Sequence, residues 1–321
     1  MIDWTPEPIW FSIGPLHVYW YGVMYAVGLA AVYWVVHREV VRRGLDAGLL
    51  VNGMIIVAVA ALIGGRIYHV IDQWALYKDN LVLIVLPPYT GLGAYGGIVT
   101  GFIAGVAYAV YKKQPLAPWA DSAVIGVLTM QAIGRWGNFF NQELYGPPTT
   151  LPWGIAIDCE HRTSTWACPP VGTTPADAHF QPLFLYESIS GAIGAIVLSW
   201  VGRHVRWVRD GDLVLLFFVW YGTTRFLLEP LRTNNWLFFG IPTASVLSGL
   251  AVLGALAILA WRHRPGTAAG ARRTRAAALP LDDDAGAGPM FAADPSRPAA
   301  VPSAEDDPAL PAAGRPGAGE G

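Results

Sequence analysis

The chain contains seven apolar runs, each long enough to cross a lipid bilayer. A membrane-spanning helix needs about 20 mostly apolar residues. Seven stretches meet that length, namely 17–37, 50–73, 91–111, 118–137, 183–202, 212–228 and 243–261. Buried core helices of a soluble protein are the alternative, but seven such runs joined by short linkers disfavour it. The sequence therefore predicts an all-α, polytopic membrane protein with about seven transmembrane helices.

The composition agrees with a membrane protein. Only 14% of the 321 residues are charged and 54% are hydrophobic, whereas about a quarter of the residues in a soluble domain are charged. No polybasic run suggests nucleic acid binding. The chain has neither a phosphate-binding Gly-Lys-Ser loop nor a His-Glu-x-x-His motif, so we predict no cofactor and no metal. The acidic N-terminus carries no Lys or Arg, which argues against a cleavable signal peptide.

The distribution of Lys and Arg among the connecting loops predicts the orientation, because cytoplasmic loops carry an excess of both residues. One set of loops contains eight of them: Arg38, Arg42, Arg43, Lys112, Lys113, Arg203, Arg206 and Arg209. The N-terminus and the opposite set contain three: Lys78, Arg162 and Arg232. We therefore expect the N-terminus outside and the C-terminus in the cytoplasm.

Three stretches lie outside the predicted spans. Residues 139–181 are expected to form a small extracytoplasmic head. Its two cysteines, Cys159 and Cys168, are either joined by a disulfide or present as two free thiols. The apolar run 81–86 is too short to span and is expected at the membrane interface. Residues 265–321 are rich in Ala, Gly and Pro and too poor in apolar side chains to fold, so we expect a disordered cytoplasmic tail after a membrane domain of residues 1–264.

Charged side chains within the apolar runs are the strongest sign of function, since each costs about 2.5–3.5 kcal/mol at the bilayer centre. Five stand within or at the end of a run: Arg66, Arg135, Glu187, Arg225 and Glu229. Snorkelling toward water at a helix end is the alternative explanation. Arg66, Arg135 and Arg225 all fall toward the outer ends of their helices, where the positive-inside bias disfavours idle arginines. The pattern predicts that they share an anionic ligand.

The densest polar motif is GRWGNFFNQELYG, residues 134–146. On a helix, Arg135 and Asn138 lie three residues apart on one face. Asn141, Gln142 and Glu143 then add further polar groups. A helix cap needs only one such residue, so the motif favours a binding or catalytic site.

This motif resembles the diagnostic motif of the prolipoprotein diacylglyceryl transferases. Other segments resemble the same family in order, and the resemblance spans about residues 9–264: FSIGP (11–15), WYGVMY (20–25), GGR (64–66), Pro182 with YE (186–187), YGTTR (221–225) and Glu229. It implies that the sn-1,2-diacylglyceryl group of phosphatidylglycerol is transferred to the lipobox cysteine of a prolipoprotein signal peptide. A thioether forms and glycerol phosphate leaves, which is the first step of bacterial lipoprotein maturation.

The resemblance also implies the site residues. The family's functional positions correspond to Tyr21, Arg135, Asn138, Glu143, Gly146, Tyr221 and Arg225. Arg135 and Arg225 are expected to hold the phosphate, and Asn141 and Arg66 to help bind substrate. Glu143 is expected to pair with an arginine, with a role as a base as the alternative. The family commonly has a His before a Gly-Gly pair where this chain has Tyr95, so we expect Tyr95 to contribute to the site without serving as a histidine-like base. A lipid transporter or flippase is the competing function, and it would need polar groups along a path through the membrane. A pure lipid-binding scaffold is the remaining alternative.

Overall fold

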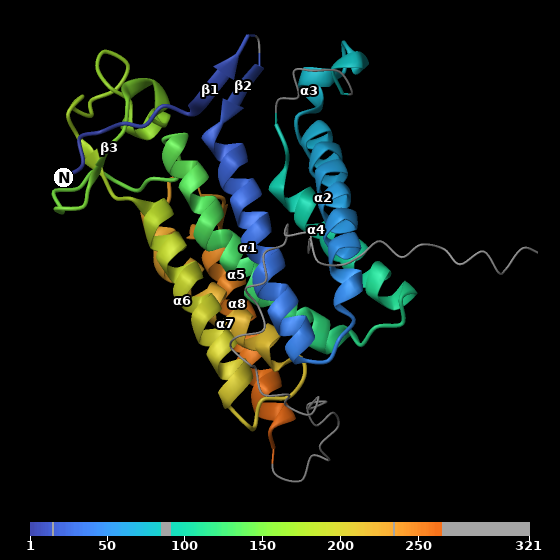
Figure 1. The fold of residues 1–321 in the computed structure, drawn as a ribbon. Helices are drawn as coiled ribbons and strands as arrows, with labels where there is room; N and C mark the ends of the chain where they lie inside the picture. The colour runs from blue at the N-terminus through green and yellow to red at the C-terminus, as the bar shows by residue number, and fades with distance from the viewer. Residues whose placement is uncertain (15, 85–90, 234, 265–321) are drawn as a thin grey trace, which may run out of the picture. The chain divides into compact units, whose positions relative to one another are not determined.

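The computed structural model describes residues 1–14, 16–84, 91–233 and 235–264. Within these residues, seven helices are long and apolar enough to cross a membrane, which confirms the predicted fold class. They are α1 (Trp20–Arg42), α2 (Leu50–Asp72), α4 (Ala94–Tyr111), α5 (Leu116–Phe140), α6 (Leu183–His204), α7 (Asp212–Leu228) and α8 (Thr243–Arg262), shown in Figure 1. A single short helical turn, α3 (Trp74–Tyr77), follows α2. The predicted tail, residues 265–321, lies outside the described residues.

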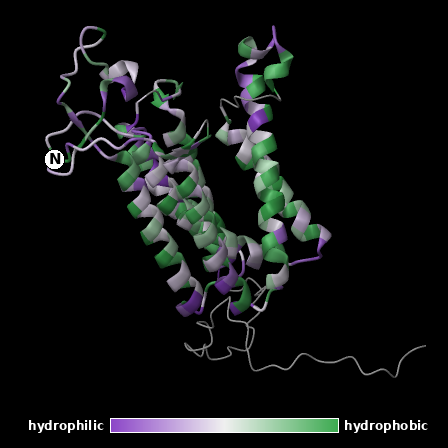
Figure 2. Ribbon diagram, turned by 45° about the horizontal axis from the view of Figure 1, so that its top comes forward, coloured by the Kyte–Doolittle hydropathy of each residue, from purple (hydrophilic) through white to green (hydrophobic). Residues whose placement is uncertain are grey.

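The seven helices are apolar on their outward faces as well as between helices. Large side chains such as Ile71 and Phe102 are exposed at 70% and 71%, as expected where lipid rather than water is the solvent. Figure 2 shows hydrophobic residues along the helices and hydrophilic residues near helix ends and in connecting segments. A helix suits this environment because it satisfies every backbone N–H and C=O within the segment.

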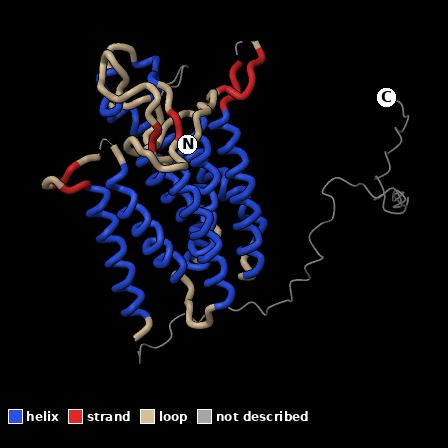
Figure 3. The backbone as a smooth tube through the Cα atoms, turned by 90° about the vertical axis from the view of Figure 1, so that its left-hand side faces the viewer, coloured by secondary structure: helices blue, strands red, loops and turns tan. Residues whose placement is uncertain are grey.

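Within the described ranges, short strands occur only before or between the helices (Figure 3). β1 (Ile9–Ile13) pairs with β2 (Leu16–Tyr19), β3 (Ile155–Ala156) with β4 (His179–Phe180), and β5 (Leu237–Phe238) with β6 (Ile241–Pro242), each pair antiparallel. The first span was predicted from His17, but α1 begins at Trp20. The residues before it pair with β1, with Gly14 at φ +58° after that strand.

Single turns of 3-10 helix complete the connections. They are η1 (Ala47–Leu49), η2 (Leu81–Ile84), η3 (Cys159–His161), η4 (Ser164–Trp166) and η5 (Glu229–Leu231). The apolar run 81–86 therefore begins in a helical turn, while residues 85–90 lie outside the described residues.

Helices α2 and α4 pack closely because glycines stand at their contact. A Cβ built on Gly96 would lie 2.2 Å from the carbonyl oxygen of Gly64, and one on Gly64 would lie 2.0 Å from the hydroxyl of Thr100. That hydroxyl donates a 2.8 Å hydrogen bond to the carbonyl of Ala60. Small residues that let two backbones approach are typical of helix contacts in membranes. Among the other long helices, α1 packs on α5, α5 on α6, and α7 on α8.

Buried carboxylates join five helices at the end where α1, α6 and α8 finish. Glu39, Asp121 and Asp212 are at most 1% exposed. Glu39 meets Arg42 at 2.5 Å and Arg203 at 2.8 Å. Asp212 meets Arg262 at 3.1 Å and His263 at 2.8 Å. Asp121 accepts hydrogen bonds from the backbone N–H of Gly211 and of Val214, at 2.9 and 3.1 Å, and so fixes the start of α7.

The close α2–α4 contact predicts an asymmetry between two glycines. Gly96→Ala should lower the free energy of unfolding by about 1–3 kcal/mol or more, because the added Cβ overpacks the contact. Gly254→Ala on α8 is the matched control, since nothing lies within 4 Å of its Cβ position. Thermal unfolding in detergent, followed by tryptophan fluorescence, measures both. Equal shifts in the two variants would contradict the packing argument.

Candidate functional site

The carboxylate of Glu187, on the second turn of α6, stands at the centre of a cluster of arginines. Its oxygens form ion pairs with Arg135 of α5, with the Nε at 2.6 Å, and with Arg232. The Nη1 of Arg225, on α7, lies 4.0 Å from it. Arg225 also pairs at 2.7 Å with Glu229, one helical turn further on. The cluster thus joins α5, α6, α7 and η5 at one end of the helices.

The two carboxylates of this cluster are buried, whereas the arginines are partly exposed. Glu187 and Glu229 are exposed at 4% and 1%. The side chains of Arg135, Arg225 and Arg232 keep 28%, 21% and 21% of their surface exposed. Three guanidiniums thus share two carboxylates, and a guanidinium has five N–H donors. Donor capacity therefore remains for a further anion that reaches the open side.

The motif of residues 134–146 begins in the last turns of α5 and turns sharply after Phe140. The guanidinium of Arg135 donates to the side-chain oxygen of Asn138 at 3.3 Å, as their spacing predicts. Asn138 and Asn141 in turn donate to the carboxylate of Glu143, at 3.0 and 3.3 Å. Glu143 was expected to pair with an arginine. That expectation is wrong for the described ion pairs, because the two asparagine amides bind its carboxylate instead.

Tyr21 of α1 reaches the motif by packing on a glycine. A Cβ on Gly137 would lie 2.8 Å from the Tyr21 ring, so only glycine leaves room for it. The Tyr21 hydroxyl lies 3.3 Å from that of Tyr25. Gly146 closes the motif, where its N–H donates to the carbonyl of Gln181 at 2.8 Å and a Cβ would meet the carbonyl of Leu231 at 3.1 Å.

The remaining predicted residues lie around the cluster or apart from it. Tyr221 stands one turn before Arg225 on α7 and stacks on Phe217. Arg66 donates to the backbone carbonyls of Leu83 and Ile84, at 2.7 and 3.1 Å, and so binds the segment after α3. None of these described partners belongs to the Glu187 cluster.

Tyr95 lies on the first turn of α4 and is 68% exposed, with its ring 6.0 Å from Tyr68. The two glycines that follow it pack against α2, where a Cβ on Gly97 would lie 3.1 Å from the carbonyl of Ala61. The structure therefore brings Arg135 and Arg225 together and gives Tyr95 a place on the α2–α4 pair.

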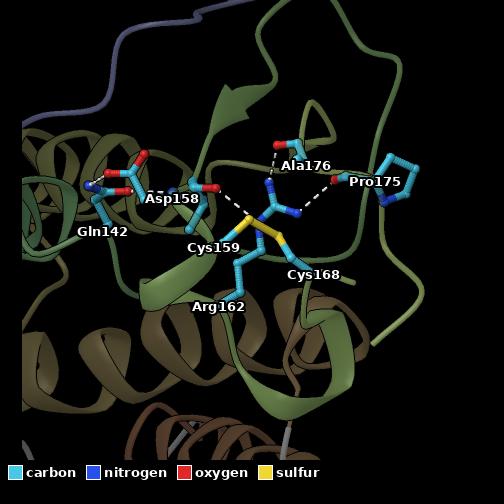
Figure 4. The surroundings of a disulfide bond; sticks show 8 residues. Gln142, Asp158, Cys159, Arg162, Cys168, Pro175 and Ala176 are labelled. Carbon is cyan, nitrogen blue, oxygen red and sulfur yellow. Dashed lines mark hydrogen bonds between the residues drawn. A yellow bond between two sulfur atoms is a disulfide. The ribbon is translucent and has the colours of Figure 1, made fainter. Parts of the chain in front are cut away.

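The segment between α5 and α6 has a small core, formed by Tyr145, Ile155, Ile157 and Phe180 together with Phe184 of α6. A disulfide joins Cys159 and Cys168 (Figure 4). Beside it, Arg162 donates to the carbonyls of Ile157, Pro175 and Ala176, at 2.9, 2.8 and 2.6 Å. These bonds hold three parts of the segment together.

The sequence analysis missed the role of Arg232. From the sequence it was counted only as a cation of a loop. In the structure Arg232 follows η5. The side-chain amide of Asn235 donates at 3.2 Å to the backbone carbonyl of Arg232 and to that of Glu229. Glu187 was recognised as a buried charge without a partner being assigned. A usable signal was present, because Glu229 and Arg232 stand three residues apart around Pro230, a residue favoured in the first turn of a helix.

The fold and the cluster define a multi-pass membrane protein with partly open arginines at one end of its helices. A family model described as prolipoprotein diacylglyceryl transferase matches residues 8–261. A relative from Streptococcus equi subsp. equi, named phosphatidylglycerol–prolipoprotein diacylglyceryl transferase, is 32% identical over 266 residues, which are 80% of this chain and 96% of the relative. A relative of the same name from Streptococcus uberis is 30% identical over 263 residues, 81% and 97% of the two chains. The chain belongs to the prolipoprotein diacylglyceryl transferase family.

The central position of Glu187 predicts a large effect of removing its charge. Glu187→Gln should lower the free energy of unfolding toward the lower end of about 3–5 kcal/mol, because three arginines then lose a buried counter-charge but remain partly solvated. Glu160→Gln is the matched control, an exposed carboxylate expected to change stability by less than about 0.5 kcal/mol. Denaturation in detergent compares them. Equal stability would show that Glu187 does not hold the cluster.

Proposed function

We propose that the chain transfers the sn-1,2-diacylglyceryl group of phosphatidylglycerol to the lipobox cysteine thiol of prolipoproteins. The bond between the glycerol C3 carbon and its phosphate oxygen breaks, the cysteine sulfur bonds to that carbon, and glycerol phosphate leaves with the electron pair. The cysteine reacts as its thiolate, whose proton has passed to the surrounding water. The observation that carries the proposal is the arrangement of Arg135 and Arg225 on one buried carboxylate with exposed donors.

The arginines suit the charge that develops in this reaction. Negative charge grows on the leaving phosphate oxygen, and a guanidinium offers a fixed fork of donors to a phosphate. Glu187 and Glu229 hold Arg135 and Arg225 in place beforehand, so little reorganisation is needed when the phosphate arrives. Preorganised donors of this kind in a partly dry site often supply the largest single part of catalysis.

The neighbouring neutral groups suit recognition of the substrates. The amide of Asn138 lies beside Arg135, that of Asn141 lies beside Glu143, and Tyr21 packs on Gly137. We assign them to the headgroup or to the peptide backbone. The substrate supplies its own nucleophile, so the enzyme needs none. A cysteine thiol with a pKa near 8.5 is already a few per cent thiolate at pH 7.

A lipid transporter fits the structure less well. Along α5, from Asp121 at one end to Arg135 at the other, Ile125 and Leu128 are fully buried. They belong to an apolar cluster with Leu198 and Leu213. The charges of the described residues therefore gather near the two ends of the helices, with apolar packing between them, rather than along a continuous path.

Mass spectrometry of a lipobox peptide tests the proposed reaction. Purified protein, phosphatidylglycerol and the peptide should give a peptide whose mass has increased by one diacylglyceryl group. Phosphatidylcholine in place of phosphatidylglycerol controls for headgroup specificity. Movement of phosphatidylglycerol between leaflets with no modified peptide would favour the transporter.

Two substitutions should rank the contributions to catalysis. Arg135→Ala is expected to abolish activity, because losing one well-placed donor can cost about a hundredfold or more. Tyr95→Phe should reduce activity by about tenfold or less, since Tyr95 lies on the α2–α4 pair and the thiol needs little help to ionise. Activity is compared at equal membrane levels across a range of pH. If Tyr95→Phe is as inactive as Arg135→Ala and higher pH does not rescue it, the ranking is wrong.

The orientation forms part of the same proposal, with the N-terminus and the site outside the cytoplasm of a bacterium and the protein in its inner membrane. The excess of Lys and Arg in the opposite loops supports it. The Cys159–Cys168 disulfide supports it as well, because disulfides persist in oxidising compartments.

Reporter fusions test this orientation. A reporter that is active only outside the cytoplasm should work when fused after Thr173 and fail when fused after Pro265. A reporter active only in the cytoplasm is the control and should give the opposite result. The reversed pattern for both would refute the orientation.

A further inference from the structure

Gln142 adopts a backbone conformation that its residue type disfavours. Its φ is +52°, and Leu144, two residues later, has a φ of +59°. Glycine enters this left-handed region readily, whereas other residues meet a clash between Cβ and the backbone. The two left-handed residues flank Glu143, the residue whose carboxylate binds Asn138 and Asn141. The direction of the Glu143 side chain therefore depends on a turn that the chain does not favour by itself.

The side chain of Gln142 is fixed at both ends of its amide. It is 3% exposed. Its nitrogen donates to the carboxylate of Asp158 at 2.5 Å and to the carbonyl of Pro6 at 3.3 Å, and its oxygen accepts the backbone N–H of Asp158 at 2.8 Å (Figure 4). A buried amide with all these partners is held in one place, because releasing it would leave polar groups unpaired.

Asp158 is itself held by the segment between α5 and α6. It precedes Cys159, the first residue of η3 and one half of the disulfide. The residue before Asp158 is Ile157, whose carbonyl accepts a hydrogen bond from the Nε–H of Arg162. Figure 4 shows the disulfide, Arg162 and the Gln142–Asp158 pair as neighbours.

We propose that Gln142 is a positioning residue for the transfer reaction. Its amide, clamped by Asp158 of the disulfide-bonded segment, keeps the turn after α5 left-handed. The turn brings the carboxylate of Glu143 to the side-chain nitrogen of Asn138, which donates a hydrogen bond to it. The side-chain oxygen of Asn138 in turn accepts a hydrogen bond from the guanidinium of Arg135. This inference rests on the proposed function for its activity readout, but it concerns residues that neither the resemblance nor the cluster assigned.

A comparison of Gln142→Ala with Gln142→Gly separates positioning from simple fastening. Both variants lose the clamp, but only glycine adopts the left-handed turn without strain. Gln142→Ala should lower kcat about tenfold, with KM for phosphatidylglycerol within about twofold. Gln142→Gly should stay within about threefold of the wild-type kcat. If the Gln142–Asp158 hydrogen bonds only attach the segment between α5 and α6 to the end of α5, both variants will lower kcat equally. That result would overturn the proposal.

Asp158→Ala provides a second arm that does not depend on the alanine variant folding. It should slow the wild-type protein but have little further effect in the Gln142→Gly background, where the turn no longer needs a clamp. An equal loss in both backgrounds would overturn the proposal. Gln73→Ala is the matched control, because its amide also binds a carboxylate, that of Asp72 at 2.7 Å, but on the exposed end of α2. It should leave activity unchanged.

Hydrogen exchange of residues 138–146 distinguishes failure of this inference from failure of the proposed function. The N–H of Glu143 donates to the carbonyl of Asn138 at 2.9 Å in the native turn. Its exchange should be about tenfold faster in Gln142→Ala and nearly unchanged in Gln142→Gly, whatever reaction the protein catalyses. Equal exchange in the two variants would overturn the positioning role even if the transferase assay succeeds.

Discussion

The buried carboxylate of Glu187 is the point at which four separate parts of the chain meet. Arg135, Arg225 and Arg232 come from α5, α7 and the residue after η5, and each lies within ion-pair distance of it. Three guanidiniums could not share this place without a carboxylate, because their repulsion grows in a medium of low dielectric constant. Glu187 therefore both links α5, α6 and α7 at this end and holds the arginines in place.

The two ends of the helices use the same residue types for different purposes. Asp121 is covered by a guanidinium and by two backbone N–H groups, and Glu39 by several arginines, so their acceptor capacity is satisfied inside the protein. At the Glu187 end the side chains of Arg135 and Arg225 are 28% and 21% exposed. Arg42 and Arg203 beside Glu39 are exposed to a similar degree, at 22% and 36%, so exposure alone does not separate the two ends. What distinguishes the Glu187 end is its neighbours, since the polar motif of residues 134–146 continues from Arg135 through Asn138 to Glu143.

Much of the fold could be predicted because the signals are local. Apolar length alone predicted the seven spans, and the spacing of Arg135 and Asn138 predicted their contact. Two of the pairs that the sequence analysis did not predict are non-local. Arg232 lies 45 residues from Glu187, and Arg203 lies 164 residues from Glu39. The partner of Glu143 was predicted wrongly for the opposite reason. The left-handed turn at Gln142 directs the carboxylate of Glu143 to the nearby amides of Asn138 and Asn141, and a linear sequence does not reveal that turn.

The substrate's own sulfur is the nucleophile in the proposed reaction, so the fold has little need for a strong base. This agrees with the presence of tyrosine rather than histidine at position 95. Tyr95 lies on the α2–α4 pair, where glycines allow the two helices to pack closely. The demanding part is the departure of a phosphate, and its stabilisation requires donors that are already in place. Glu187 and Glu229 hold the charged donors. The clamp on Gln142 acts on the neutral ones through Glu143 and Asn138. Two buried carboxylates and one strained turn thus serve the same requirement, because each fixes a donor before the leaving group develops its charge.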